Sequence, residues 1–200
     1  MNEIGENPLS ASERKLLSIA RQLGPIARSE VTAHSGLSQQ SVHRHIDSLQ
    51  SRGFLRLRPA TIKGRGKPSP LVEINQDTYV SLGLSFTTEK VLACLLNLKG
   101  VPLIECELDV HPNKPTDVLN MLEAKIADWT AAELKNRQMI GVGIAMQGYR
   151  TDATDQFETP RLLGNWQNLD LTTLFQDRFK LPVFTENNAT SCATAEFYLG

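Results

Sequence analysis

The sequence predicts an α/β chain with an N-terminal winged helix-turn-helix followed by a second domain built on a mixed sheet. Helical periodicity recurs in three segments of residues 10–52, and two short strands around a glycine-rich basic loop follow them. From residue 77 onward, three strands come first, and strands then alternate with helices. We therefore expect a winged helix-turn-helix domain at residues 1–76 and an α/β domain at residues 77–200.

Composition separates the two domains and limits the class of protein. Residues 1–76 hold eleven Lys and Arg against six Asp and Glu, whereas residues 77–200 hold ten against sixteen. A basic N-terminal part favours a nucleic-acid partner. No apolar run approaches the roughly 20 residues of a membrane span, so we expect no membrane contact. Three widely spaced cysteines, Cys94, Cys106 and Cys192, indicate reduced core thiols in a cytoplasmic protein.

The first two helices are bounded by residues that start and stop helices. One helix is expected from about Ser10 or Ser12 to Leu23, where a Gly-Pro pair ends it. A short helix follows at about Arg28–His34, and Gly36 in the next turn suits a left-handed backbone. The apolar residues expected to face the core are Leu16, Leu17, Ile19, Ala20, Leu23 and Val31.

The third helix, Leu37–Arg52, carries residues suited to reading DNA. Ser38 is a good N-cap, and Val42, Ile46 and Leu49 form one apolar stripe. Glutamine and arginine on the opposite face can pair with adenine and guanine in the major groove. The candidate DNA-contacting residues of this helix are Ser38, Gln39, Gln40, Ser41, His43 and Arg44, and Asp47 shares their face. The alternative is an amphipathic helix with a solvated polar face.

The strands Phe54–Arg58 and Leu71–Ile74 flank the glycine-rich basic loop. We expect Lys63, Arg65 and Lys67 at the tip of a wing, where they contact phosphates or enter the minor groove of double-stranded DNA. A flexible basic linker is the alternative, and the strands on both sides argue against it.

The second domain predicts a mixed sheet of the actin-like, ribonuclease H-like type. The segment Met139–Met146 is almost continuously apolar, which predicts a strand covered on both faces. A long polar loop leads from it to Trp166. The expected strands are residues 79–86, 91–98, 101–109, 139–146 and 182–186, and the expected helices are residues 115–135, 171–179 and 189–199.

Several segments resemble the ROK family and come in the order of that family. They are the wing sequence GRGKP, the strand pair VSLGLSFTTEKVLACLLNLKG, GVGIAMQG, the NW pair and LPVFTENNATSCATAE. The family contains bacterial sugar kinases and sugar-responsive repressors, and the resemblance covers about Leu16 to Gly200. ROK repressors usually continue into a second lobe with a zinc motif and a sugar segment. The resemblance therefore implies a truncated chain without the second lobe, and no cofactor or metal in the part present.

The resemblance also implies that the phosphate-binding turn of ROK kinases is altered. Those kinases carry an aspartate-glycine-glycine-threonine turn, and Ser85, Thr87, Thr88 and Glu89 stand at the matching positions. Two β-branched residues in place of glycines keep the backbone from a phosphate, and Glu89 repels it. Asn188 replaces the aspartate that acts as general base, and an amide cannot take a proton near pH 7. We therefore expect no enzyme activity.

What remains at this end of the second domain is a polar cluster suited to binding a ligand. Glu186, Asn187 and Asn188 follow the last strand, at the end where open α/β sheets bind ligands. Asn165, beside Trp166, is placed by the resemblance at the pocket mouth. We expect these residues to bind a sugar or sugar phosphate effector. The alternative is that Asn187 and Asn188 only cap the last helix.

The sequence thus predicts a DNA-binding transcription regulator that represses genes of sugar uptake or catabolism. In the mechanism that the resemblance implies, a homodimer binds a palindromic operator, and a sugar or sugar phosphate weakens that binding. One alternative is an ATP-dependent ROK sugar kinase with an added DNA-binding domain. Another is a module that docks a regulatory protein on its acidic lobe.

Overall fold

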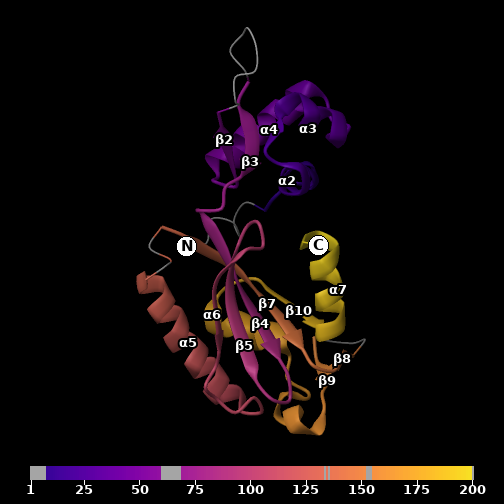
Figure 1. The fold of residues 1–200 in the computed structure, drawn as a ribbon. Helices are drawn as coiled ribbons and strands as arrows, with labels where there is room; N and C mark the ends of the chain where they lie inside the picture. Colours follow the sequence, from indigo (N-terminus) through magenta and orange to yellow (C-terminus); the bar gives the residue numbers. More distant parts are fainter. Residues whose placement is uncertain (1–7, 60–68, 133, 135, 152–154, 200) are drawn as a thin grey trace. The chain divides into compact units, whose positions relative to one another are not determined.

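The computed structural model describes residues 8–59, 69–132, 134, 136–151 and 155–199 (Figure 1). The chain divides into two compact units, Met1–Tyr79 and Val80–Gly200. Within the described ranges, no helix is both long and apolar enough to cross a membrane.

The described part of the first unit contains helices packed on a small antiparallel sheet with the strand order β1-β3-β2 (Figure 1). The elements are α2 (Ala11–Leu23), β1 (Ile26–Ala27), α3 (Arg28–Ser35), α4 (Gln39–Ser51), β2 (Leu55–Arg58) and β3 (Leu71–Ile74). In the sheet, Leu57 lies opposite Val72, and Ile26 lies on the other side of Val72. The predicted helices and both predicted strands are confirmed, whereas the short strand β1 was not expected.

The helix ends of this unit are set by capping residues, of which Ser38 and Gly36 were predicted. The Ser10 side chain accepts from the backbone N–H of Glu13 at the start of α2, and Ser38 caps α4 in the same way. Gly36 ends α3 with a φ of +66°, as its place in the turn predicted. The expectation that Leu23 faces the core is wrong, because Leu23 is 49% exposed. It is the last residue of α2 and lies beyond the part of the helix that packs against the core.

The second unit is built on a five-stranded mixed sheet with the strand order β10-β7-β4-β5-β6. Strand β5 is antiparallel to both β4 and β6, and β10 is parallel to β7. The strands are β4 (Tyr79–Phe86), β5 (Val91–Asn97), β6 (Pro102–Glu107), β7 (Gln138–Met146) and β10 (Val183–Asn187), and the helices are α5 (Pro115–Ala132), α6 (Leu171–Phe179) and α7 (Asn188–Leu199). The predicted order of strands and helices is confirmed, with ends that differ by a few residues.

The segment between β7 and α6, predicted as a polar loop, contains more regular structure than expected. Strands β8 (Tyr149–Arg150) and β9 (Phe157–Glu158) form a hairpin, and a 3-10 helix, η1, runs over Arg161–Trp166. Phe157 is buried in the core of the unit, which anchors this hairpin.

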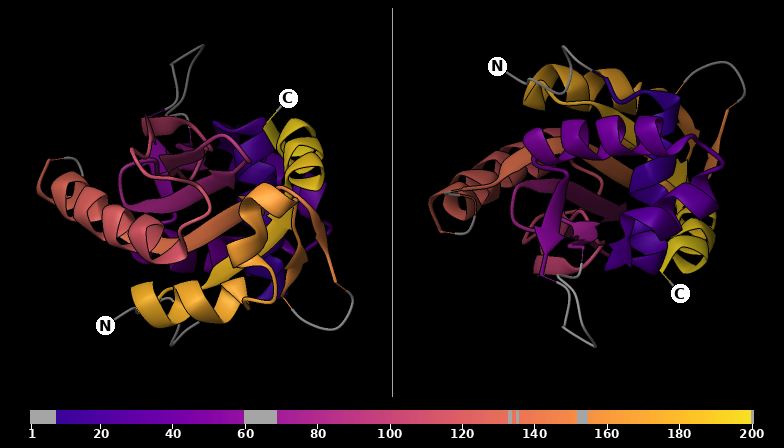
Figure 2. Two further views of the ribbon diagram at one scale, coloured as in Figure 1. Left: turned by 90° about the horizontal axis from the view of Figure 1, so that it is seen from below. Right: turned by 90° about the horizontal axis from the view of Figure 1, so that it is seen from above.

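Helices α5 and α6 cover one face of the large sheet, and α7 lies on the other side (Figure 2). The covered face contributes the alternating residues Val80, Leu82, Leu84 and Phe86 of β4 to the core. The other face is only partly covered. The expectation that Met139–Met146 is buried on both faces is therefore wrong for Gly143, which is exposed.

The cysteines of the second unit are free thiols. Burial raises the pKa of the Cys94 and Cys106 thiols. Cys192 is not the predicted core thiol, because it lies on the exposed surface of α7.

Candidate functional site

Helix α4 presents a polar face because its opposite side is buried in the core of the first unit. Val42, Ile46 and Leu49 are fully buried along one stripe. The predicted DNA-contacting residues of α4 are Ser38, Gln39, Gln40 and Arg44, which are exposed, and Ser41 and His43, which are half-buried. Packing of the stripe therefore fixes the direction in which Gln40 and Arg44 point.

The two serines among these residues are engaged with each other at the helix start. The Ser38 hydroxyl accepts from the backbone N–H of Ser41 at 3.2 Å and donates to the Ser41 hydroxyl at 3.0 Å. They hold the first turn of α4 in place, which also positions the side chains that follow.

The Glu13 carboxylate, which was not among the predicted site residues, joins α4 to α2. Glu13 Oε2 accepts from the backbone N–H and the hydroxyl of Ser10, both at 2.9 Å. Its Oε1 accepts from the Ser48 hydroxyl at 2.9 Å and lies 3.7 Å from Arg52 Nη1. Burial raises the pKa of Glu13, but these hydrogen bonds and the Arg52 charge outweigh burial, so the pKa lies below its ordinary value. The capping-box spacing of Ser10 and Glu13 was the available signal.

A second ion pair links α4 to α3. Arg28 Nη2 donates to Asp47 Oδ1 at 2.8 Å. Asp47, noted in the sequence only as part of the polar face of α4, therefore has a charged partner on the neighbouring helix.

The predicted wing-tip residues lie outside the described part of the chain: Lys63, Arg65 and Lys67. Of the basic residues in the flanking strand β2, Arg56 is bound to two carboxylates. Its Nε donates to Glu73 Oε1 at 2.7 Å, and its Nη1 donates to Asp77 Oδ2 at 2.9 Å. Arg58 is exposed.

In the second unit, the backbone N–H groups of the turn after β4 donate hydrogen bonds to acceptors of the protein itself. The Thr87 hydroxyl accepts from the backbone N–H groups of Glu89 and Lys90, at 3.3 and 3.1 Å. The backbone N–H of Thr87 donates to the Lys90 carbonyl, and that of Thr88 donates to Gln147 Oε1 at 2.8 Å. This turn, which the resemblance aligns with the phosphate turn of ROK kinases, has its N–H groups engaged within the protein.

The two adjacent asparagines after β10 have different roles. Asn187 Oδ1 accepts from the backbone N–H of Thr190 at 2.8 Å, which makes it the cap of α7. Asn188 Nδ2 instead donates to the Phe86 carbonyl at 3.1 Å, so it joins the start of α7 to the end of β4. Its Oδ1 is buried and has no hydrogen-bond partner among the described residues. Glu186 Oε1 accepts from the backbone N–H of Asn187.

Asn165 is engaged with the loop that precedes α5. Its backbone N–H donates to Asn113 Oδ1, and its side-chain Nδ2 donates to the Asn113 carbonyl, both at 2.8 Å. Trp166 is fully buried beside Phe86, with ring centres 4.8 Å apart, and its Nε1 donates to the Pro112 carbonyl. The structure thus gives the Asn165-Trp166 pair a packing role that its spacing did not reveal.

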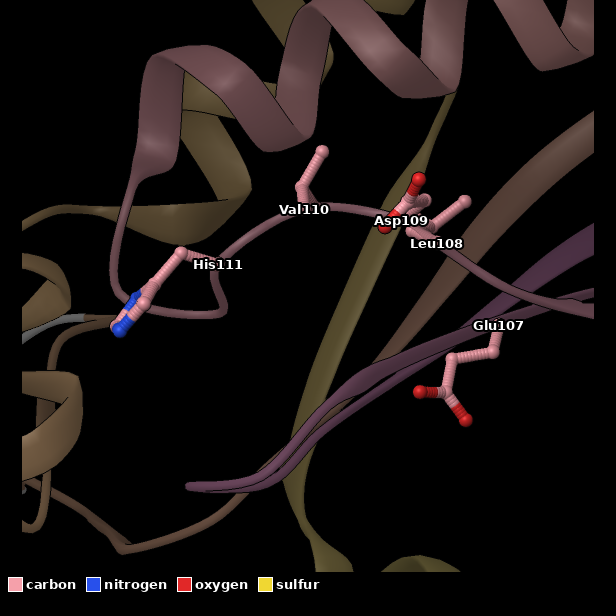
Figure 3. Close-up of a pocket in the computed structure, with 5 residues that line it drawn as sticks. All are labelled: Glu107, Leu108, Asp109, Val110 and His111. Carbon is pink, nitrogen blue, oxygen red and sulfur yellow. The ribbon is translucent and has the colours of Figure 1, made fainter.

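A surface hollow lies at the end of β6, and none of the predicted site residues lines it (Figure 3). It is lined by Glu107, Leu108, Asp109, Val110 and His111. The His111 ring and the two carboxylates lie apart in Figure 3, and Lys90 Nζ is 3.4 Å from Glu107. Among the described residues, no group of three His, Cys, Asp or Glu side chains is arranged to hold a metal ion.

The mixed sheet, with α5 and α6 on one face and α7 on the other, defines a lobe of the actin-like type. The chain belongs to the ROK family, whose sequence model matches residues 81–200. The structure is similar to that of a ROK family transcriptional regulator described as a homologue of the E. coli MLC protein. That match has a TM-score of 0.72 and 22% identity, and it covers 92% of this chain and 47% of that one.

Curated relatives match both units. A transcriptional regulator of Mycobacterium tuberculosis is 28% identical over 182 residues, which cover 90% of this chain and 41% of the relative. The xylose repressor of Bacillus subtilis is 24% identical over 191 residues, covering 94% of this chain and 49% of that repressor. Among solved structures, that of a putative N-acetylmannosamine kinase from Listeria monocytogenes is also similar. The match covers 60% of this chain and 39% of that one, with 16% identity and a TM-score of 0.50. The chain spans about half the length of the curated relatives it matches.

Proposed function

We propose that this protein is a transcription regulator whose first unit is a winged helix-turn-helix that binds double-stranded DNA. The observation that carries this proposal is α4, a helix capped by Ser38, buried on one side and exposing Gln40 and Arg44 on the other. A recognition helix needs this combination, because it must be held firmly while its side chains reach base edges. The relatives named transcriptional regulator and xylose repressor support the proposal.

In this proposal, α4 reads the major groove and the wing contacts the backbone. Lys63, Arg65 and Lys67 add affinity that does not depend on sequence, because they act on phosphates. A homodimer places two α4 helices on a palindromic operator.

We further propose that the second unit senses a sugar or sugar phosphate and represses sugar uptake or catabolism genes through the first unit. The polar groups at the ends of β4 and β10 support a ligand site there. Asn188 Oδ1 is a buried acceptor without a partner among the described residues, and Glu186 adds a half-buried carboxylate nearby in sequence. A sugar hydroxyl is a donor suited to such an acceptor. Asn165 is bound to Asn113, so in this proposal it contributes only by helping to position the loop that also holds Trp166.

The alternative of a sugar kinase is disfavoured by two features of the same region. The turn Thr87–Lys90 spends its N–H groups within the protein, so a phosphate finds few donors there. Asn188 uses its amide N–H₂ group to hold the Phe86 carbonyl and provides no base for a sugar hydroxyl.

DNA binding is tested by titrating the full chain into a labelled mixed-sequence duplex at about 50 and 200 mM salt. We expect affinity to fall at least tenfold, because each phosphate contact releases counterions. An affinity that does not depend on salt, or no binding, contradicts the proposal.

Catalysis and sensing are tested separately. A coupled assay for ADP release with a broad sugar panel is expected to show no sugar-dependent turnover, and turnover would favour the kinase. The same panel, with the corresponding sugar phosphates, is expected to contain a compound that raises the melting temperature of the second unit. The proposed effector site is wrong if no compound does so.

A further inference from the structure

The exposed face of α4 carries a carboxylate beside the residues proposed to read bases. Asp47 lies three residues after Arg44 and seven after Gln40, so the three side chains share one face of the helix. That face is opposite the buried stripe, and the Asp47 side chain is 63% exposed. A negative charge at this place is unexpected in a surface that meets a polyanion.

Asp47 is bound to an arginine of the neighbouring helix. Arg28, the first residue of α3, donates from Nη2 to Asp47 Oδ1 at 2.8 Å, and its side chain is 22% exposed. A guanidinium carries five N–H donors, so this one bond does not exhaust its capacity. The Arg28 guanidinium therefore lies at the edge of the face that would approach DNA.

A carboxylate and a phosphate compete for the same planar donor group. Arginine binds both through paired N–H groups, and it favours whichever anion is better placed. In the structure the carboxylate holds it. A phosphate that approaches Arg28 therefore competes with Asp47 for the guanidinium.

We propose that Asp47 is a specificity-determining residue, which lowers affinity for DNA of arbitrary sequence by holding Arg28 back from the phosphates. This inference rests on the proposed DNA-binding function. DNA of arbitrary sequence offers mainly phosphate contacts, so the loss of Arg28 matters most there. On the operator, base contacts by Gln40 and Arg44 supply part of the binding free energy, so the loss matters less. A regulator gains from this difference because non-specific sites vastly outnumber operators.

The test compares Asp47→Asn with the unmodified full chain on two duplexes. One is a mixed-sequence duplex, and the other is a sequence selected by the unmodified chain from a random library. We expect Asp47→Asn to bind the mixed-sequence duplex about threefold or more tightly, with a salt slope steeper by about 0.9 from one added phosphate contact. Affinity for the selected sequence should rise less, so the ratio of the two affinities should fall.

Two further variants make this test decisive. Asp77→Asn removes the same charge from the same unit, and Asp77 is 65% exposed and also paired with an arginine, Arg56. It should leave both affinities almost unchanged. Adding Arg28→Gln to Asp47→Asn should abolish the gain. The inference fails if Asp77→Asn has the same effect as Asp47→Asn, if the gain survives without Arg28, or if both duplexes gain equally. No binding by the unmodified chain would instead refute the proposed function.

Discussion

At the scale of single residues, Asn187 and Asn188 show how neighbours of identical chemistry acquire different roles. Both are suitable helix caps in sequence, and both were candidates for effector binding. The last residue of β10 is Asn187, which places its side chain at the start of α7 and makes it the cap. Asn188 follows within the helix and reaches Phe86 on another strand. This division depends on where β10 ends, which the sequence placed at Glu186.

Replacing each asparagine by aspartate separates these roles. Asn188→Asp loses the donor to the Phe86 carbonyl and brings a carboxylate against that oxygen, so we expect a destabilisation of roughly 1–3 kcal/mol. Asn187→Asp keeps the acceptor for the Thr190 N–H and should have little effect. Urea unfolding followed by tryptophan fluorescence reports on this unit alone, because Trp129 and Trp166 both lie in it. Equal effects of the two substitutions would contradict these roles. Neither variant is expected to phosphorylate sugars.

Glu13 is a residue whose importance was not evident from the sequence. Its partners are Ser48 of α4 and Arg52, which directly follows α4. Both lie more than thirty positions away in the chain, and no local pattern indicates them. The capping box gives only the contact with Ser10.

The depressed pKa of Glu13 predicts a pH-dependent stability of the first unit. A carboxyl whose folded pKa lies below its unfolded value stabilises the fold above the unfolded pKa, which for a glutamate is near its ordinary value of 4.5. That contribution is lost as the pH falls through the folded pKa. Unfolding of the first unit is followed by ellipticity at 222 nm and compared with tryptophan fluorescence, which reports on the second unit. The free energy of unfolding of the first unit should decrease as the pH falls from 6 into the acidic range. Glu13→Gln should be less stable at pH 6 and should lose part of this pH dependence. An unchanged pH dependence would show that Glu13 is not the group responsible.

At the scale of elements, the helices and strands of both units follow from periodicity and caps, whereas the segment between β7 and α6 does not. Its hairpin and η1 are held by partners elsewhere, namely Phe157 in the core and the bonds of Asn165 and Trp166 to Asn113 and Pro112. Such contacts join residues more than fifty positions apart, so the local sequence carries little sign of them. Only the polar composition of the segment was visible locally, and polar composition favours a loop.

The turn between α3 and α4 can be tested at Gly36. Its φ of +66° strains any residue with a Cβ, but the space around a Cβ there is empty. Gly36→Ala should therefore cost only the backbone term, about 1–2 kcal/mol, and Gly36→Asn should cost less because asparagine adopts this conformation more readily. Ellipticity at 222 nm during urea unfolding measures both. A larger loss for asparagine than for alanine would mean that the turn is limited by space rather than by backbone strain.

At the scale of the whole molecule, the chain joins a basic unit to an acidic one, and each has its own fold. The charge division was visible in composition, and the ROK segments indicated the fold of the second unit before any geometry. Composition does not show which of these charges are paired with each other. Arg28 and Arg56 are paired with carboxylates, so the net charge of the first unit overstates the number of cations ready for a phosphate.

Replacing Arg44 with alanine tests whether α4 reads bases. Arg44 is exposed on α4, and a pair of hydrogen bonds to a guanine is worth about 1–3 kcal/mol. Fluorescence anisotropy is measured with the full chain on its selected sequence and on a mixed-sequence duplex. Arg14→Ala, which removes the same charge from the exposed surface of α2, serves as the control. We predict that Arg44→Ala loses about 1–3 kcal/mol on the selected sequence and clearly less on the mixed one. Equal losses on both duplexes, of the same size as those of Arg14→Ala, would show that Arg44 does not read bases.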